Sequence, residues 1–140
     1  MKILVPVDGS PFTKRMLAYI AAHDEWLGNA HQYTLLHVSP AVPARAAVAL
    51  DKGVLQTYYA EESEKVFKPL RSFFEQQKIT VDCVAKTGAA ADVIAKTASK
   101  GRFDLLMMGS HGHGALVNLV LGSVVTQVLA RCTTPVLIVR

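Results

Sequence analysis

Cysteine is scarce in this sequence of 140 residues, which contains only Cys83 and Cys132 and no CxxC spacing. A disulfide framework or a zinc site needs several closely spaced cysteines, so neither is expected. Both thiols lie inside apolar patterns, which is typical of free, buried cysteines in a cytoplasmic protein.

Long apolar runs are missing from the N-terminus as well. The apolar stretch of residues 1–8, MKILVPVD, is interrupted by proline and ended by aspartate. It is too short for a signal peptide or a membrane span. We therefore expect a cytoplasmic protein that is not anchored in a membrane.

Basic residues are present, but they are not concentrated in one stretch. The formal net charge is +4, yet the cations are scattered along the sequence, as on solvated helix faces, and they are not interleaved with aromatic residues. This spacing does not predict nucleic-acid binding. With 51% hydrophobic and 19% charged residues, the composition is that of a soluble globular protein. The length predicts a single domain over residues 1–140.

Short β-branched runs alternate with longer amphipathic segments along the chain. Strands are expected at residues 3–7, 33–38, 80–86, 104–108 and 136–139, helices at 11–27, 51–78, 88–100 and 123–132, and a mobile loop at 40–49. This alternation predicts the α/β class, with a doubly wound, five-stranded parallel sheet. The third strand carries charge and suits a sheet edge, so the expected strand order is 3-2-1-4-5.

In that order the chain direction reverses between the first and fourth strands. Open α/β sheets bind ligands at the carboxyl ends of the strands that flank such a reversal. Asp8 follows the first strand, and the segment from Gly109 to Gly112 follows the fourth. Both segments are therefore expected to face one crevice.

The glycines after the fourth strand follow the spacing G-x2-G-x9-G-S, formed by Gly109, Gly112, Gly122 and Ser123. Ser123 is expected to cap the last helix, whose free N–H groups then form an anion site. No Lys or Arg lies between Arg102 and Arg131. Backbone N–H groups and a divalent ion must therefore neutralise any phosphate, which predicts dependence on magnesium.

Several other chemistries are not supported. The sequence has neither G-x-x-x-x-G-K-[ST] nor a G-x-G-x-x-G after the first strand, which argues against a P-loop motor or a conventional NAD enzyme. His111 and His113 form an H-x-H pair but have no third ligand nearby, so no metal site is expected. No serine has a visible base partner, and no catalytic residue is assigned.

The segments VPVDGS, LLHV, MGSHGHG, VLGS and PVLIVR resemble the universal stress protein family, in the same order from Lys2 to Arg140. The spacing G-x2-G-x9-G-S is similar to that of the single-domain, ATP-binding branch of the family. The resemblance implies a Rossmann-like fold of the adenine nucleotide alpha hydrolase type. It also implies that ATP, ADP or AMP binds together with Mg.

The resemblance implies a role for each matching position. Pro6, Val7 and Asp8 would border the adenosine, with Asp8 reaching the ribose or a phosphate-bound metal, and Val38 would offer backbone contacts to adenine. Met108, Gly109, His111 and Gly112 would wrap the ribose and phosphates, and Gly122, Ser123 and Val124 would hold the phosphate tail. Valine at Gly112 or Gly122 is expected to abolish binding without unfolding the domain.

The last strand, Val136, Leu137, Ile138 and Val139, is apolar on both faces and lies at an expected sheet edge. It predicts a homodimer in which two copies of the strand pair antiparallel, as the resemblance also implies. The favoured function is a nucleotide-dependent switch in the stress response. Two alternatives stay open: an interaction module of the same fold that binds no nucleotide, and a slow ATPase.

Overall fold

The computed structural model describes residues 1–114 and 118–140. Part of the predicted glycine loop, residues 115–117, lies outside the described residues. The strands are β1 (Lys2–Pro6), β2 (Gln32–Ser39), β3 (Val81–Thr87), β4 (Leu105–Gly109) and β5 (Val136–Val139). The helices are α1 (Pro11–Ala22), α2 (Asp24–Leu27), α3 (Ala44–Val48), α4 (Lys52–Gln76), α5 (Ala90–Lys100) and α6 (Ser123–Arg131).

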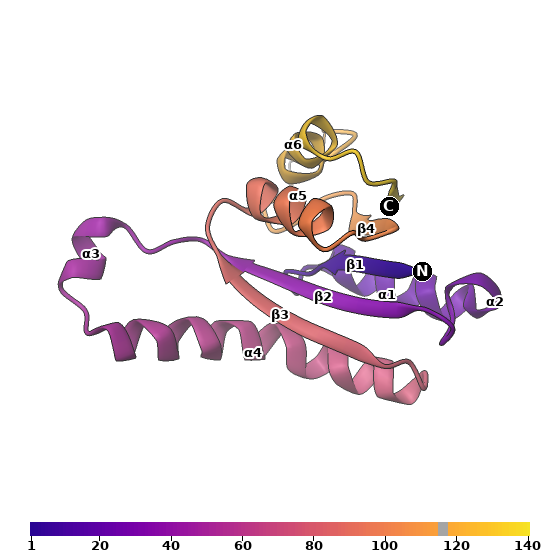
Figure 1. Cartoon of the computed structure of the whole chain (residues 1–140), viewed down its shortest axis with the longest axis horizontal. Coiled ribbons are helices and arrows are strands. Elements are labelled where there is room, and N and C mark those ends of the chain that lie inside the picture. Colours follow the sequence, from indigo (N-terminus) through magenta and orange to yellow (C-terminus); the bar gives the residue numbers. More distant parts are fainter. Residues whose placement is uncertain (115–117) are drawn as a thin grey trace.

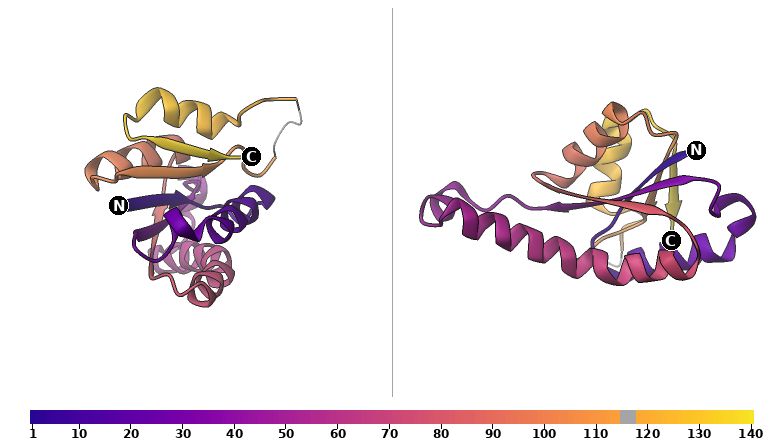
Figure 2. Two further views of the ribbon diagram at one scale, coloured as in Figure 1. Left: turned by 90° about the vertical axis from the view of Figure 1, so that its right-hand side faces the viewer. Right: turned by 60° about the horizontal axis from the view of Figure 1, so that its bottom comes forward.

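The five strands form one parallel sheet in the order β3-β2-β1-β4-β5, which confirms the predicted topology. Helices α1 and α4 cover one face, and α5 and α6 cover the other (Figures 1 and 2). Successive side chains of β1 point to opposite faces of the sheet, so this strand contributes to the core on both sides. Ile3 and Val5 pack toward α1 and α4, and Leu4 packs toward α5 and α6.

The predicted first helix is broken in the structure. It ends at Ala22, and the short helix α2 follows after His23. The His23 ring Nδ1 donates to the Tyr19 carbonyl at 2.8 Å, while the His23 backbone N–H pairs with the Ile20 carbonyl at 3.3 Å. The side chain thus takes the carbonyl that the next turn of α-helix would need, and the helix stops.

The segment predicted as a mobile loop, residues 40–49, contains the helix α3. Its run of alanines favours helix because alanine has the highest helical propensity. Helix α4 begins at the N-cap Asp51, whose Oδ1 accepts from the Gly53 N–H at 2.8 Å. Together, α3 and the first part of α4 form an arm that projects from the body (Figure 1).

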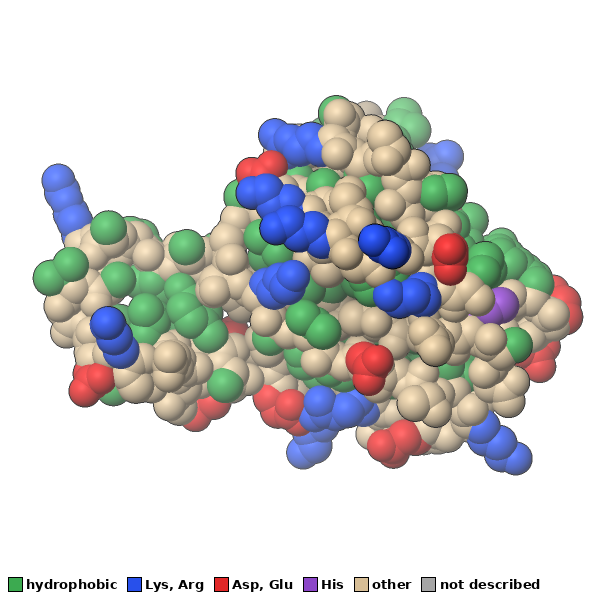
Figure 3. All heavy atoms as spheres, viewed as in Figure 1, with side chains coloured by type: hydrophobic (Ala, Val, Ile, Leu, Met, Phe, Trp, Pro, Cys, Tyr) green, Lys and Arg blue, Asp and Glu red, His purple; other side chains and the backbone are tan. Residues whose placement is uncertain are grey.

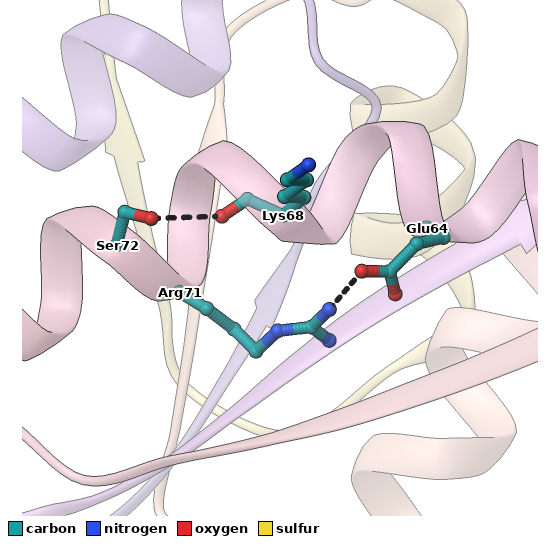
Figure 4. A network of polar contacts seen from close by, with 4 residues as sticks. All are labelled: Glu64, Lys68, Arg71 and Ser72. Atoms are coloured by element: carbon teal, nitrogen blue, oxygen red, sulfur yellow. Dashed lines mark hydrogen bonds and ion pairs between the residues drawn. The ribbon is translucent and has the colours of Figure 1, made fainter.

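One flank of α4 is polar. Arg71 donates to the Glu64 carboxylate across two helical turns, and the Ser72 hydroxyl donates to the Lys68 carbonyl at 3.4 Å (Figure 4). Both members of the Arg71–Glu64 pair are exposed, so it contributes on the order of 0–1 kcal/mol to stability. The fold therefore depends on the inner face of α4, where Phe67, Leu70 and Phe74 are buried.

Both cysteines are free but only half-buried, so the prediction of free thiols is confirmed and that of full burial is wrong. Burial raises the pKa of the Cys83 thiol even though Arg71 lies beside it. Among residues 1–114 and 118–140, no helix combines the length and the apolar character that crossing a bilayer requires.

Replacing Tyr33 by phenylalanine is expected to cost about 1–3 kcal/mol of unfolding free energy. The buried Tyr33 hydroxyl donates to the Leu27 carbonyl, and phenylalanine would leave that carbonyl unpaired. Burial raises the pKa of Tyr33 to about 12, so wild-type stability should also fall above about pH 10, where the unfolded chain begins to ionise. Urea titrations of both proteins at neutral and alkaline pH measure these effects, and equal midpoints at neutral pH would contradict the first.

Candidate functional site

The carboxyl ends of β1 and β4 border a cavity of about 390 Å³. Every position predicted from the sequence lines it: Pro6, Val7, Asp8, Val38, Met108, Gly109, His111, Gly112, Gly122, Ser123 and Val124. The crevice predicted at the topological reversal is therefore present, and it is open rather than filled by the protein's own side chains.

Asp8 lies in the short connection between the end of β1 at Pro6 and the start of α1 at Pro11. Its Oδ1 accepts from the Ser10 N–H at 2.9 Å and from the Thr13 hydroxyl at 3.0 Å. Burial by itself would raise the Asp8 pKa, but the hydrogen bonds from Ser10 and Thr13 and the nearby His113 outweigh it and hold that pKa below the ordinary aspartate value. Asp8 is therefore a fixed carboxylate at neutral pH.

His113 ties the glycine loop to the end of β1. Its ring Nε2 donates to the Asp8 carbonyl at 2.7 Å, and its backbone N–H donates to Asp8 Oδ2 at 3.3 Å. From the sequence, His113 was considered only as a metal ligand. In the structure, these two hydrogen bonds hold the glycine loop against the end of β1.

His111 is held within the loop. Its Nε2 donates to the Leu119 carbonyl at 2.8 Å, which leaves Nδ1 to accept from the Ser110 hydroxyl at 3.0 Å. Its ring also stacks obliquely near Phe12, with 5.1 Å between ring centroids. Both ring nitrogens of His111 therefore have protein partners. Among the residues the structure describes, no three His, Cys, Asp or Glu side chains gather as a metal site would require.

Ser110 does have a base partner, which corrects the prediction that no serine has one. However, Ser110 is only 2% exposed and does not line the cavity. A buried hydroxyl cannot reach a ligand in the cavity, so this pair stabilises the loop and does not supply a nucleophile.

The glycines of the loop lie close to other atoms of the protein. A Cβ at Gly112 would lie 2.6 Å from Asp8 Oδ2, and one at Gly122 would lie 3.1 Å from the His111 Cα. At Gly109 it would lie 2.8 Å from the Phe12 Cβ. Valine at Gly112 would therefore push the Asp8 carboxylate aside, and valine at Gly122 would press on the backbone of His111, so either change would alter the loop even without a ligand. That the domain stays folded in both variants stays a prediction.

Helix α6 points its N-terminus at the cavity. The first bond of its ladder joins the Thr126 N–H to the Gly122 carbonyl at 3.1 Å, so the N–H groups of Ser123, Val124 and Val125 have no acceptor within the helix. Gly122, not Ser123, is the N-cap, and Ser123 is instead the first, exposed residue of the helix. The predicted anion site thus lies one residue from where a serine cap would put it.

Several residues that line the cavity were not predicted from the sequence. These positions are Thr13, Leu36, Ala90, Ile94, His113, Gly114, Leu119 and Val125. Ala90 and Ile94 belong to α5. This helix follows the edge strand β3 and crosses over the sheet to reach β4 beside its central strand β1. An amphipathic pattern shows that Ile94 faces inward, but only the crossover places it at this cavity.

The sequence model of the Universal stress protein family matches residues 1–140. The chain belongs to this family. A universal stress protein of Thermus aquaticus is 31% identical, with 99% of this chain and 97% of the relative covered. The five-stranded parallel sheet of this chain, in the order β3-β2-β1-β4-β5, is thus the sheet of a universal stress protein.

Solved universal stress proteins share the fold. One from Methanocaldococcus jannaschii is 27% identical over 99% of this chain and 94% of its own length, and its structure superposes with a TM-score of 0.78. The AMP-bound structure of an Arabidopsis thaliana family member has a TM-score of 0.70 at 16% identity, covering 99% and 90% of the two chains. A universal stress protein in complex with cAMP has a TM-score of 0.67 at 22% identity, covering 100% and 97%. At these identities the last two show the fold alone.

Replacing Asp8 by asparagine is expected to cost about 1 kcal/mol of unfolding free energy at neutral pH, because the bonds from Ser10 and Thr13 lose their charged acceptor. The folded pKa of Asp8 lies below its unfolded value, so the charge stabilises above about pH 4 and its contribution disappears as pH falls through the lower, folded pKa. Denaturation midpoints across this range should converge for the two proteins at low pH. A constant difference at every pH would contradict this assignment.

Proposed function

We propose that this universal stress protein binds an adenine nucleotide, ATP with Mg, in the cavity between β1 and β4, and that it acts as a nucleotide-dependent switch in the stress response. The observation that carries the proposal is the convergence of one carboxylate, the ends of β1 and β4 and a helix N-terminus on a cavity of about 390 Å³. That volume lies in the range of small-molecule sites. Solved family members with AMP and with cAMP support an adenine nucleotide as the ligand.

The adenine would meet the backbone of Val38. The Leu36 carbonyl accepts from the Val7 N–H on the β1 side, whereas the Ser39 carbonyl accepts from the Gly88 N–H on the β3 side. Alternation along the strand therefore turns the N–H and C=O of Val38 toward β1, beyond the point where β1 ends. The Val7 carbonyl, which an extended β1 would offer to Val38, accepts instead from the His37 ring at 2.9 Å. The Val38 N–H and C=O therefore offer one donor and one acceptor at the cavity, and the edge of an adenine base needs one of each.

The phosphates would meet the N-terminus of α6. Three backbone N–H groups, those of Ser123, Val124 and Val125, and the positive end of the helix dipole face the cavity. No Lys or Arg lines the cavity among the residues the structure describes. The remaining phosphate charge calls for a divalent cation.

Magnesium fits this site only as a companion of the phosphates. Asp8 is the one carboxylate in the described lining, and its Oδ1 is already shared by Ser10 and Thr13. Asp8 Oδ2 could add a single oxygen ligand, and Mg²⁺ completes its shell with phosphate oxygens and water. When bound, the ion would neutralise the triphosphate beside Asp8.

A switch fits better than a fast enzyme. Hydrolysis needs a base positioned against the attacking water. Asp8 is held as a hydrogen-bond acceptor with a lowered pKa, and Ser110 is buried beside His111. In this proposal the protein changes state when nucleotide binds or leaves, and not through fast hydrolysis.

The binding proposal is tested by denaturing freshly purified protein and identifying any released nucleotide, followed by calorimetric titration of the nucleotide-free protein. We expect retained or rebound ATP, ADP or AMP, and tighter ATP binding with Mg²⁺ than with a chelator. A GTP titration serves as the matched control, because guanine reverses the donor and acceptor that Val38 would read. Absence of bound nucleotide in both experiments would overturn the proposal.

We also propose a homodimer formed by β5, and a cytoplasmic location in keeping with two free thiols. Strand β5 is the edge opposite β3, and Val136, Leu137 and Ile138 are half-exposed on it. Two such edges can pair antiparallel around a two-fold axis. Light scattering should give a dimeric mass for the wild type and a monomeric mass for Leu137→Lys; a monomeric wild type would refute the pairing.

A further inference from the structure

Lysines that look scattered in the sequence meet in one open groove on the α5 side of β3. The groove has a volume of about 600 Å³, and its rim carries Lys86 of β3 and Lys96 and Lys100 of α5. Figure 3 shows a group of basic side chains over this part of the molecule. Three lysines thus gather on a face that the nucleotide proposal does not use.

These three ammonium groups lack acidic partners. Every ion pair among the described residues lies elsewhere, on α4 or between Arg131 and Asp92. Lys86 Nζ donates to the Thr97 hydroxyl at 2.9 Å, which holds its charge over the groove. Lys96 and Lys100 are one helical turn apart, a like-charge spacing that destabilises a helix. Lys100 lies in the last turn of α5, where the helix dipole favours a cation, but no carboxylate pairs with either lysine among the described residues.

Acidic side chains near the groove leave the charge unbalanced. Asp92 is the partner of Arg131 at 3.5 Å, and Asp104 accepts from the backbone N–H of Lys2 at 2.7 Å. Asp82 is exposed on β3 but does not line the groove, and no Asp or Glu is in the described lining. The groove therefore carries excess positive charge.

The floor of the groove is apolar. Val93 and Phe103 line it together with the hydrocarbon stems of the lysines. Lys2 Nζ lies 4.9 Å from the centroid of the Phe103 ring and donates to the Gly101 carbonyl at 2.6 Å. A fourth cation therefore covers one face of the only aromatic ring in the groove lining.

We propose that this groove binds an acidic, amphipathic segment of a partner protein, with one apolar side chain on Val93 and Phe103 and carboxylates on the lysines. Lysine ammonium groups act as separate point charges, which suits carboxylates spread along a peptide; phosphate recognition favours the arginine fork. Single-strand nucleic-acid sites usually offer several aromatic rings for successive bases, whereas Phe103 is the one aromatic residue in the described groove lining. A membrane surface would need an apolar protrusion, whereas here the apolar surface is recessed.

The test uses the full-length protein and a fluorescent peptide that alternates glutamate with leucine. The triple variant Lys86→Gln, Lys96→Gln, Lys100→Gln is compared with a control variant of equal charge, Lys14→Gln, Lys52→Gln, Lys68→Gln, whose positions are all exposed. Fluorescence anisotropy should show at least a tenfold loss of affinity for the groove variant and less than a twofold change for the control. Replacing the glutamates of the peptide by glutamine should abolish binding.

Three outcomes would overturn the inference: no binding of the acidic peptide to the wild type, equal losses in the two variants, or groove-dependent binding that is stronger for single-stranded RNA or anionic phospholipid vesicles than for the peptide. Circular dichroism confirms that the variants fold, which is expected because all six lysines are exposed. The experiment is run without nucleotide, so its result is independent of the binding site between β1 and β4.

Discussion

Replacing Ser123 by glutamate should weaken binding of ATP with Mg²⁺ by at least tenfold, which corresponds to about 1.4 kcal/mol. The new carboxylate would stand at the first position of α6, where the proposed phosphate tail meets the free N–H groups of Val124 and Val125. Repulsion between unit charges about 5 Å apart is on the order of 3 kcal/mol near a protein surface, and magnesium offsets part of it. Adenosine, which lacks phosphates, should bind both proteins equally.

The matched control is Ser123→Gln, which has the same size but no charge. Ser123 is exposed, and an acidic residue in the first turn favours a helix, so neither variant should lose thermal stability. Calorimetric titration of ATP and adenosine into the two variants separates charge from bulk. If glutamate and glutamine weaken ATP equally, or if adenosine is weakened as much as ATP, the phosphates do not lie at α6.

Replacing Phe74 by alanine should cost about 3–5 kcal/mol of unfolding free energy. Phe74 is fully buried where α4 meets the sheet, and its ring packs against Tyr33 with 5.7 Å between centroids. Alanine would leave a cavity between α4 and β2 that the surrounding backbone cannot close. The loss is a large part of the 5–15 kcal/mol that usually stabilises a domain.

Tyr58 provides the control on the same helix. Its side chain is 50% exposed on the projecting arm, so Tyr58→Ala should change the unfolding free energy by no more than about 0.5 kcal/mol. Urea denaturation followed by tryptophan fluorescence measures both variants. Comparable losses for the two would mean that the arm packs in solution as tightly as the body does.

The strands could be predicted because their patterns are strong. The runs around Leu4 and Leu106 are apolar on both faces, as buried parallel strands must be, and the charges of β3 mark an edge. Their ends agree with the predictions to within one residue. The helix break at His23 could not be predicted, since it depends on a ring nitrogen reaching the Tyr19 carbonyl, and no periodicity of apolar residues reports that bond.

The site could be predicted in position but not in its internal contacts. The reversal of topology places Asp8 and the glycine loop together, and the structure puts both on one cavity. Sequence spacing could not show that His113 would bond to Asp8, because the two are brought together only by pairing of β1 with β4. It also did not show that a side chain at Gly112 would meet Asp8, whose carboxylate lies 2.6 Å from the position of such a Cβ.

The lysine groove shows a further limit of reading along the chain. Lys86 and Lys96 are separated in sequence by the turn into α5, and they meet only when that helix folds back antiparallel to β3. Net charge alone did not indicate a partner. The proposed acidic partner is inferred from the distribution of charge in three dimensions.

A crystal structure grown with ATP and Mg²⁺ tests the central claim most directly. The account predicts a nucleotide between β1 and β4, with adenine at the Val38 backbone and the phosphates at the N-terminus of α6, without a lysine or arginine contact. An empty cavity in crystals that hold ATP elsewhere, or a triphosphate bound through basic side chains, would contradict it.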